Sequence, residues 1–246
     1  MKVKLEAYTR DADAVCGMAA RTCVSEEIQH LRAPDTGELI PRATSLRMAL
    51  ASGHESVAEH ATFTFSIEGI SRACSHQLVR HRMASYSQQS QRYVNMDWFE
   101  YVTPKSIESP DKEVHYRFYD DETTEFYLGG IGVSDAYRKI MHDIAVLYRK
   151  MVLAGIPEED ARYILPNACK TNIVVTMNAR ELRHFFALRC CTRAQAEIRE
   201  LADEMLRLAK LQAPFLFENA GPSCKTTGRC PEGANSCGRY RREASE

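Results

Sequence analysis

The sequence predicts an α+β fold, a single domain in which helices pack on a central mixed or antiparallel sheet. Short stretches with alternating apolar and polar residues are typical of half-buried strands, and longer stretches with the 3.6-residue apolar period of helices separate them. Gly or Pro ends several of these stretches. A length of 246 residues suits one large domain or two small ones.

The alternating pattern predicts strands at residues 2–8, 61–69 and 171–177. The middle one is the clearest, because Phe63 and Phe65 are separated by threonine. Residues 104–133 are polar and aromatic with several glycines near their end, and we expect a loop region there, with room for a short helix.

The helical pattern predicts seven helices, at residues 11–23, 44–52, 70–79, 135–154, 157–165, 179–189 and 193–212. Gly53 and Gly155 stand where the second and fourth of them should end. Ser134 is the expected N-cap of the fourth, and Asn178 with Glu181 has the spacing of a capping box before the sixth. We therefore expect a domain at residues 1–217, followed by a cysteine-containing tail at 218–246.

The composition excludes several classes of protein. A net charge of −1 argues against a globally basic nucleic-acid binder. There is no apolar run long enough for a membrane span, and the charged N-terminus does not resemble a signal peptide. We therefore expect a cytoplasmic protein with no membrane partner.

Nine cysteines are present, and their odd number argues against a secreted disulfide framework. Cys190 and Cys191 lie near arginines, which could favour a thiolate, but no general base is evident, so two core thiols are the preferred interpretation. Cys224, Cys230 and Cys237 have the spacing C-x5-C-x6-C, which is a weak zinc signal. We expect no bound metal, while a site completed by another chain, a reversible disulfide and reduced thiols all stay open.

The stretch RHRMASYSQQSQRY, residues 80–93, combines arginines with serines and glutamines and has little to bury. Arginine forks suit phosphate or carboxylate, and glutamine amides can both donate to and accept from a heterocycle. The stretch therefore suits a nucleotide, although a solvated loop with surface arginines has the same composition.

A second basic segment covers the helix at 179–189, where Arg189 lies beside apolar residues. A partly buried arginine needs an anionic partner, which can be a ligand. The structural alternative is a ladder of salt bridges to neighbouring glutamates. His54 and His60 are six residues apart, which is not the spacing of the HExxH zinc motif.

The sequence resembles the flavin-dependent thymidylate synthases in five segments, which occur in the same order as in that family. Arg80-His81-Arg82, then seven residues and Ser90, match the signature of that family. GHESVAEHATFTFSI precedes the signature, and ARYILPNA, MNARELRHFFALR and AQAEIRELA follow it in the family's order. The resemblance covers about residues 1–217 and implies the thymidylate synthase-complementing-protein fold, as a homotetramer with active sites at subunit interfaces.

The resemblance implies reductive methylation of dUMP to dTMP. FAD would be the cofactor, NADPH would reduce it, and 5,10-methylenetetrahydrofolate would supply the one-carbon unit, without a cysteine nucleophile. No glycine-rich dinucleotide fingerprint is present, so FAD would not bind in a Rossmann half.

The resemblance also assigns roles to residues at matching positions. Arg189 would be catalytic, as the arginine that stabilises the N3-deprotonated uracil, and Ser90 would be a ligand contact. Residues expected to contact dUMP are Gln77, Arg80, Gln88, Gln89, Ser90, Gln91, Arg92, Arg162 and Arg189. Residues expected to bind FAD are His54, Ser56, Glu59, Arg80, His81, Arg82, Gln88, Asn178, Arg180 and His184.

Two other functions compete with this one. A nucleic-acid-binding module using the basic Ser/Gln stretch would show strongly salt-dependent affinity for polymer. A metal-dependent or redox regulatory protein would act through the cysteines of the tail, and a metal analysis with a thiol count would identify it.

Overall fold

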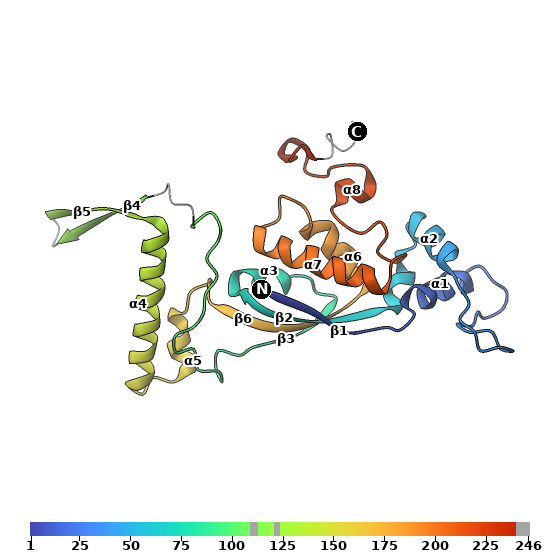
Figure 1. Cartoon of the computed structure of the whole chain (residues 1–246), viewed down its shortest axis with the longest axis horizontal. Coiled ribbons are helices and arrows are strands. Elements are labelled where there is room, and N and C mark those ends of the chain that lie inside the picture. The colour runs from blue at the N-terminus through green and yellow to red at the C-terminus, as the bar shows by residue number, and fades with distance from the viewer. Residues whose placement is uncertain (109–112, 121–123, 240–246) are drawn as a thin grey trace. The chain divides into compact units, whose positions relative to one another are not determined.

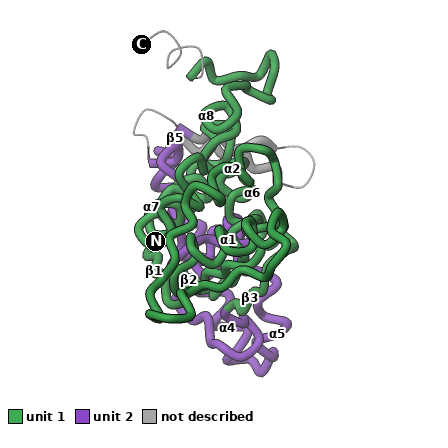
Figure 2. Tube along the Cα trace, turned by 90° about the vertical axis from the view of Figure 1, so that its right-hand side faces the viewer, with its two compact units in different colours: residues 1–68, 76–88, 172–246 green, residues 69–75, 89–171 purple. Residues whose placement is uncertain are grey.

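The structure is a computed structural model that describes residues 1–108, 113–120 and 124–239, with the side chains of 114–131 left aside. These residues form two compact units, which Figure 2 shows in different colours. Unit 1 contains Met1–Glu68, His76–Gln88 and the chain from Asn172 onward, and unit 2 contains Gly69–Ser75 and Gln89–Thr171.

Unit 1 is built on a four-stranded sheet with the order β1-β2-β6-β3. The strands are β1 (Lys2–Tyr8), β2 (Thr62–Ser71), β6 (Lys170–Asn178) and β3 (Ala84–Gln88), and the ends of β2 and β6 belong to unit 2. β1 pairs antiparallel with β2, with Val3 opposite Ile67, and β3 pairs antiparallel with β6, with Tyr86 opposite Val175. The α+β class and the antiparallel sheet are therefore confirmed.

Alternation along β2 and β6 decides which face of the sheet is buried. Phe63, Phe65 and Ile67 are fully buried, as is Val175, while Thr64 and Thr176 lie on the opposite face with their hydroxyls 2.9 Å apart. Each strand thus presents one apolar face to the core, as its two-residue period predicts. The outward face is mostly polar, although β6 also exposes Val174 there.

Helices of unit 1 pack on the apolar face, and Figure 1 shows α6 (Ala179–Arg189) and α7 (Ala196–Gln212) lying along the sheet. Phe217 joins the layers, because its ring makes edge contacts with Phe63 at 5.3 Å and with Phe186 at 5.9 Å. The other helical elements of unit 1 are α1 (Ala12–Thr22), α2 (Ala43–Ala51), the 3-10 turns η1 (Glu55–His60) and η3 (Gly233–Asn235), and α8 (Ser223–Thr227). α3 (Arg72–Leu78) is divided, because its residues up to Ser75 belong to unit 2.

α1 and α2 approach closely at a glycine. A Cβ on Gly17 would lie 2.5 Å from the carbonyl oxygen of Arg42, which stands at the start of α2. Only a residue without a side chain fits this contact, so Gly17 allows α2 to begin against α1.

Unit 2 has its own small core around α4 (Val133–Leu153). Tyr148 is fully buried there, and its hydroxyl accepts a hydrogen bond from the backbone N–H of Met96 at 3.3 Å. α5 (Glu158–Ala161) and the 3-10 turn η2 (Arg162–Ile164) follow, and β4 (Glu113–Asp120) pairs antiparallel with β5 (Thr124–Gly132). None of the helices in the described ranges is long and apolar enough to cross a membrane.

Two sequence-based expectations were wrong, and one strand was missed. Residues 104–133 contain the β4–β5 hairpin rather than a loop, because their aromatic and β-branched residues favour paired strands. Gly132, not Ser134, caps α4, and the Ser134 hydroxyl accepts a hydrogen bond from Arg138 instead. Residues 84–88, for which no secondary structure was predicted, form the edge strand β3.

The seven predicted helices are all present, and none of their ends shifts by more than four residues. α5 ends at Ala161 rather than at 165, because the 3-10 turn η2 follows it. α7 begins at Ala196 rather than at 193, with the side chain of Gln195 accepting from the N–H of Ile198. The domain boundary after residue 217 stays a prediction.

Candidate functional site

The Arg80-His81-Arg82 signature forms the turn between α3 and β3 in unit 1. The N–H of His81 donates to the carbonyl of Leu78 at 3.1 Å, which closes the turn. The Tyr86 hydroxyl lies 2.8 Å from the carbonyl oxygens of both Leu78 and His81, and burial raises its pKa, so it stays a protonated donor. Tyr86 therefore ties the turn to the strand that follows it.

The side chain of His81 is almost completely buried, with 4% of its surface exposed. Its Nδ1 lies 3.1 Å from Oε1 of Glu181, and the Nε–H of Arg189 donates to its Nε2 at 3.1 Å. Burial, then the charge of Arg189 and the proximity of His184, lower the pKa of His81 to about 4. The imidazole is therefore neutral near pH 7, and its contact with Glu181 is a hydrogen bond rather than an ion pair.

The first turn of α6 supplies Glu181. Asn178 caps this helix, because its Oδ1 accepts from the N–H of Glu181 at 2.9 Å. The return bond of a capping box is replaced, since the carboxyl group of Glu181 lies against His81. Burial raises the pKa of Glu181, and the nearby His184 lowers it in part.

Further along α6, arginines connect the helix to η1. Arg180 forms an ion pair with Glu59, and Arg183 lies 3.7 Å from the carboxylate of Glu55. Two residues expected to bind FAD, Glu59 and Arg180, are thus neighbours. The ring of His184, on the same helix, lies 5.8 Å from that of His81, measured between centroids.

Several predicted cofactor residues are exposed around these contacts. His54 and Ser56 are exposed in and beside η1, and Arg80 and Arg82 are exposed on either side of His81. In the described part of the chain, neither of these two guanidinium groups has a recorded protein partner. They are therefore available to an anionic ligand.

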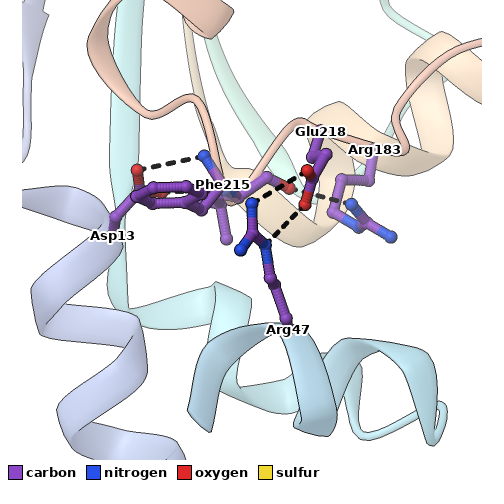
Figure 3. Close-up of polar contacts among 6 residues, drawn as sticks. Asp13, Arg47, Arg183, Phe215 and Glu218 are labelled. Carbon is purple, nitrogen blue, oxygen red and sulfur yellow. Dashed lines mark hydrogen bonds and ion pairs between the residues drawn. The ribbon is translucent and has the colours of Figure 1, made fainter. Parts of the chain in front are cut away.

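A cavity of about 440 Å³ lies in unit 1 beside these residues, with Gly53, Glu55, Arg183 and His184 in its wall. The opposite wall is the segment after α7, and Figure 3 shows how polar contacts hold it.

Those contacts come from three helices. Asp13 of α1 accepts from the N–H of Phe215 at 3.1 Å, and Arg183 donates to the carbonyl of Leu216 at 2.8 Å. Arg47 of α2 makes two hydrogen bonds to Glu218, at 2.8 and 2.9 Å, and lies over the ring of Phe215. The cavity wall is therefore fixed by α1, α2 and α6 together (Figure 3).

Unit 2 brings together another group of the predicted dUMP residues. Arg92 pairs with the carboxylate of Glu159 at 2.7 Å, and the Nε of Arg162 donates to the backbone carbonyl of the same residue at 2.9 Å. The Ser90 hydroxyl accepts from the N–H of Arg92 at 3.1 Å, and the Gln91 amide lies 3.7 Å from the sulfur of Cys169. Both arginines are thus held by α5.

The predicted dUMP residues are divided between the two units. Gln89, Ser90, Gln91, Arg92 and Arg162 lie in unit 2, while Gln77, Arg80, Gln88 and Arg189 lie in unit 1. Within unit 1, Gln77 is in the last turn of α3 and Gln88 is the last residue of β3.

Sequence reasoning missed three residues of these groups. Glu181 was expected as a cap or as a member of a salt-bridge ladder, not as the partner of His81. Tyr86 was not considered, although a tyrosine within a polar stretch is a signal for a buried hydroxyl bond. Arg72 was also missed, and burial, with the nearby charge of Arg162 as a further cause, lowers its pKa.

All nine cysteines are free thiols. Cys190 is buried, and burial raises its pKa, so it stays a thiol. Cys191 is only partly buried, so the expectation of two core thiols is confirmed for Cys190 alone. In the tail, burial and then neighbouring thiols, Cys230 first and Cys191 next, raise the pKa of Cys224. Over residues 1–108, 113–120 and 124–239, no three His, Cys, Asp or Glu side chains lie close enough to hold a metal ion.

Known proteins resemble this chain over nearly its whole length. Residues 4–215 match the model of a family described as thymidylate synthase complementing protein. The chain is 48% identical over 246 residues to the flavin-dependent thymidylate synthase of Geobacter sulfurreducens, which covers 97% of this chain and 94% of the relative. It is 46% identical over 248 residues to the enzyme of that name from Clostridium tetani, with the same coverage. For the Nitratidesulfovibrio vulgaris enzyme the identity is 50% over 192 residues, which are 78% of this chain and 74% of the relative.

Proposed function

This chain belongs to the thymidylate synthase complementing protein family of flavin-dependent thymidylate synthases, and we propose from that premise which residues carry the reaction. The protein is a methyltransferase that converts dUMP to dTMP, with FAD as its cofactor and 5,10-methylenetetrahydrofolate as the one-carbon donor. The reduced cofactor supplies the hydride that completes the methyl group.

The residues of unit 1 fit a flavin dinucleotide. Its diphosphate is a dianion, and Arg80 and Arg82 offer exposed guanidinium groups to it. Arg180, Glu59 and His184 would flank the cofactor from η1 and α6. His54, beside η1, would lie near the flavin and the folate.

For dUMP, the two arginines of unit 2 offer the donors that a phosphate monoester requires. Arg92 and Arg162 are both oriented by Glu159, so less side-chain entropy is lost when they bind a phosphate. Ser90 and the glutamines at 88, 89 and 91 would donate to and accept from the nucleotide, and Gln77 and Arg80 would contact it from α3 and the turn.

Arg189 carries the proposed chemistry, and its fixed position is the observation on which the proposal depends. Loss of the N3 proton makes the uracil ring an anion, and an anionic ring is a better nucleophile at C5. A guanidinium whose orientation is already set stabilises that anion without reorganising during the reaction. The bond from Arg189 to the buried His81 provides such an orientation.

The state of Cys190 supports a reaction in which this cysteine is not the nucleophile. Cys190 is buried, and burial raises its pKa. A protonated, buried thiol is a poor nucleophile.

Turnover of the purified protein tests the function. We expect a yellow protein that forms dTMP when dUMP, the methylene folate and NADPH are all added, and that forms none when any one is left out. A flavin-loaded protein that makes no dTMP from the complete mixture would contradict the proposal. Strong, salt-dependent affinity for nucleic acid would favour the competing binding function.

We also propose a cytoplasmic homotetramer that uses NADPH as reductant, with active sites at subunit interfaces. Light scattering of the purified protein should then give four times the subunit mass of 27.9 kDa. A monomer that retains full turnover would contradict the interfacial sites.

A further inference from the structure

Three side chains of unit 1 form a continuous line of hydrogen bonds, from a carboxylate through an imidazole to a guanidinium. Oε1 of Glu181 is 3.1 Å from Nδ1 of His81, and Nε2 of His81 is 3.1 Å from Nε of Arg189. The carboxylate and the imidazole are both sheltered, with 11% and 4% of their side-chain surfaces exposed.

The chemistry of arginine decides where the protons lie. A guanidinium keeps its Nε proton at any ordinary pH, so the Nε of Arg189 is a donor and Nε2 of His81 is the acceptor. The imidazole proton therefore sits on Nδ1, from which it is donated to Glu181. The carboxylate thus selects the one neutral tautomer that can accept from Arg189.

The surroundings of the ring favour this neutral state. The ring of Phe185 packs edge-on against His81, with centroids 4.9 Å apart, and excludes water from one side. Burial and the positive charge of Arg189 both oppose protonation of the imidazole. A protonated His81 would present an N–H to an N–H and would lose its bond to Arg189.

The bond to His81 uses only the Nε proton of Arg189. The two terminal nitrogens of the guanidinium carry four further N–H groups, which can serve an anionic ring. Fixing Nε also restricts the rotation of the planar guanidinium group, and therefore the direction in which those N–H groups point.

We propose that His81 and Glu181 are positioning residues for Arg189: His81 orients the guanidinium that stabilises the uracil anion, and Glu181 holds His81 in the tautomer that allows it. This inference depends on the proposed role of Arg189. It adds a role for Glu181, and it makes the side chain of His81 act through Arg189.

A matched pair of variants tests the role of His81. Glutamine places its amide oxygen near the position of Nε2, so His81→Gln keeps an acceptor for Arg189. Asparagine reaches only the position of Nδ1, so His81→Asn removes that acceptor. His30→Asn, an exposed histidine in a loop, is the control for the substitution itself.

For His81→Asn we expect kcat for dTMP formation, measured per bound flavin, to fall by ~100-fold, the loss typical of a misplaced catalytic group. The KM for dUMP should change much less, and His81→Gln should recover most of the loss. Equal kcat values for the Asn and Gln variants at equal flavin content would overturn the role of His81.

Glu181→Gln tests the other end of the line and remains informative if His81→Asn does not fold. Its amide can donate to Nδ1 and so favour the wrong tautomer, and we expect kcat to fall by about 10-fold or more, with flavin retained. In the double variant, Glu181→Gln should lower kcat little beyond the effect of His81→Asn, because both substitutions act through the orientation of Arg189. An unchanged kcat, or fully additive losses, would overturn the proposal.

The wild-type protein distinguishes this inference from the function on which it rests. If the wild type makes no dTMP, the proposed function fails. If the wild type is active but His81→Asn and His81→Gln have equal kcat values, only the positioning role of His81 and Glu181 fails.

Discussion

At the scale of a single residue, His81 connects the turn after α3 to helix α6. Its backbone closes the turn after α3, while its ring contacts Glu181 and Arg189 of α6. A hydrophilic residue in the middle of an arginine-rich signature is nevertheless buried and neutral. The family resemblance pointed to His81 as a contact to FAD. It did not suggest that the side chain would form hydrogen bonds within the protein, to Glu181 and Arg189.

The lowered pKa of His81 predicts acid sensitivity. The unfolded chain binds this proton near pH 6.5, whereas the folded protein resists it until about pH 4. The contribution of His81 to the unfolding free energy is therefore complete above pH 6.5 and is lost as the pH falls toward 4. At pH 5 the unfolding free energy should be lower by about 2 kcal/mol than at pH 7. Glu181, His184 and Arg189 face the ring, and the raised pKa of Glu181 acts in the opposite direction.

Denaturant unfolding at pH 7 and pH 5, at one protein concentration, measures this loss. His81→Gln lacks the titrating group, so its stability should change less over the same interval. An equal change in both proteins would contradict the assignment to His81.

Thiol chemistry gives a second prediction at the residue scale. Cys190→Ala and Cys191→Ala, alone or combined, should keep dTMP formation per bound flavin, because no step needs a thiolate there. Cys190 is buried and the variant leaves a small cavity, so some loss of melting temperature is expected. Complete loss of turnover with flavin still bound, from either substitution, would indicate a cysteine nucleophile.

At the scale of elements, α6 is the one that sets the candidate site of unit 1. Its N-terminus is fixed by Asn178, its first turn holds Glu181, and its last residue is Arg189. The capping-box spacing predicted where this helix starts. It could not predict that the glutamate turns to His81, because that partner is 100 residues away along the chain.

Asn178→Ala tests the cap. Loss of the hydrogen bond to the N–H of Glu181 should lower the unfolding free energy by about 1 kcal/mol, as for other N-caps. Asn178→Asp retains an acceptor and serves as the control, measured by the same denaturant titration. If both variants are equally destabilised, the cap is not the cause.

The strands show where local patterns fail. β1, β2 and β6 follow the alternation of their sequences, whereas β3 is short and mostly polar, and it exists because β6 offers it a partner. The β4–β5 hairpin was missed for a similar reason. The two strands pair with each other, but their sequences do not alternate regularly between apolar and polar residues.

At the scale of the whole molecule, the α+β class, seven helices and the order of the family blocks could be predicted from the sequence. The division into two compact units could not, because unit 2 is formed by two separate segments that enter and leave through β2 and β6. Likewise, the signature placed nucleotide residues on both sides of Gln88. Only the fold shows that Arg92 pairs with Glu159 of α5 and that Ser90 belongs to the same unit.

Arg189→Ala is the most direct test of the account, because the proposed chemistry depends on that guanidinium. We expect dTMP formation to fall by ~100-fold or more, as for the loss of one electrostatic stabiliser of the transition state, while the flavin content measured by visible absorbance stays near that of the wild type. Arg189→Lys keeps the charge but not the planar fork, and should recover only part of the rate. Loss of flavin and of turnover in equal measure would contradict the role given to Arg189.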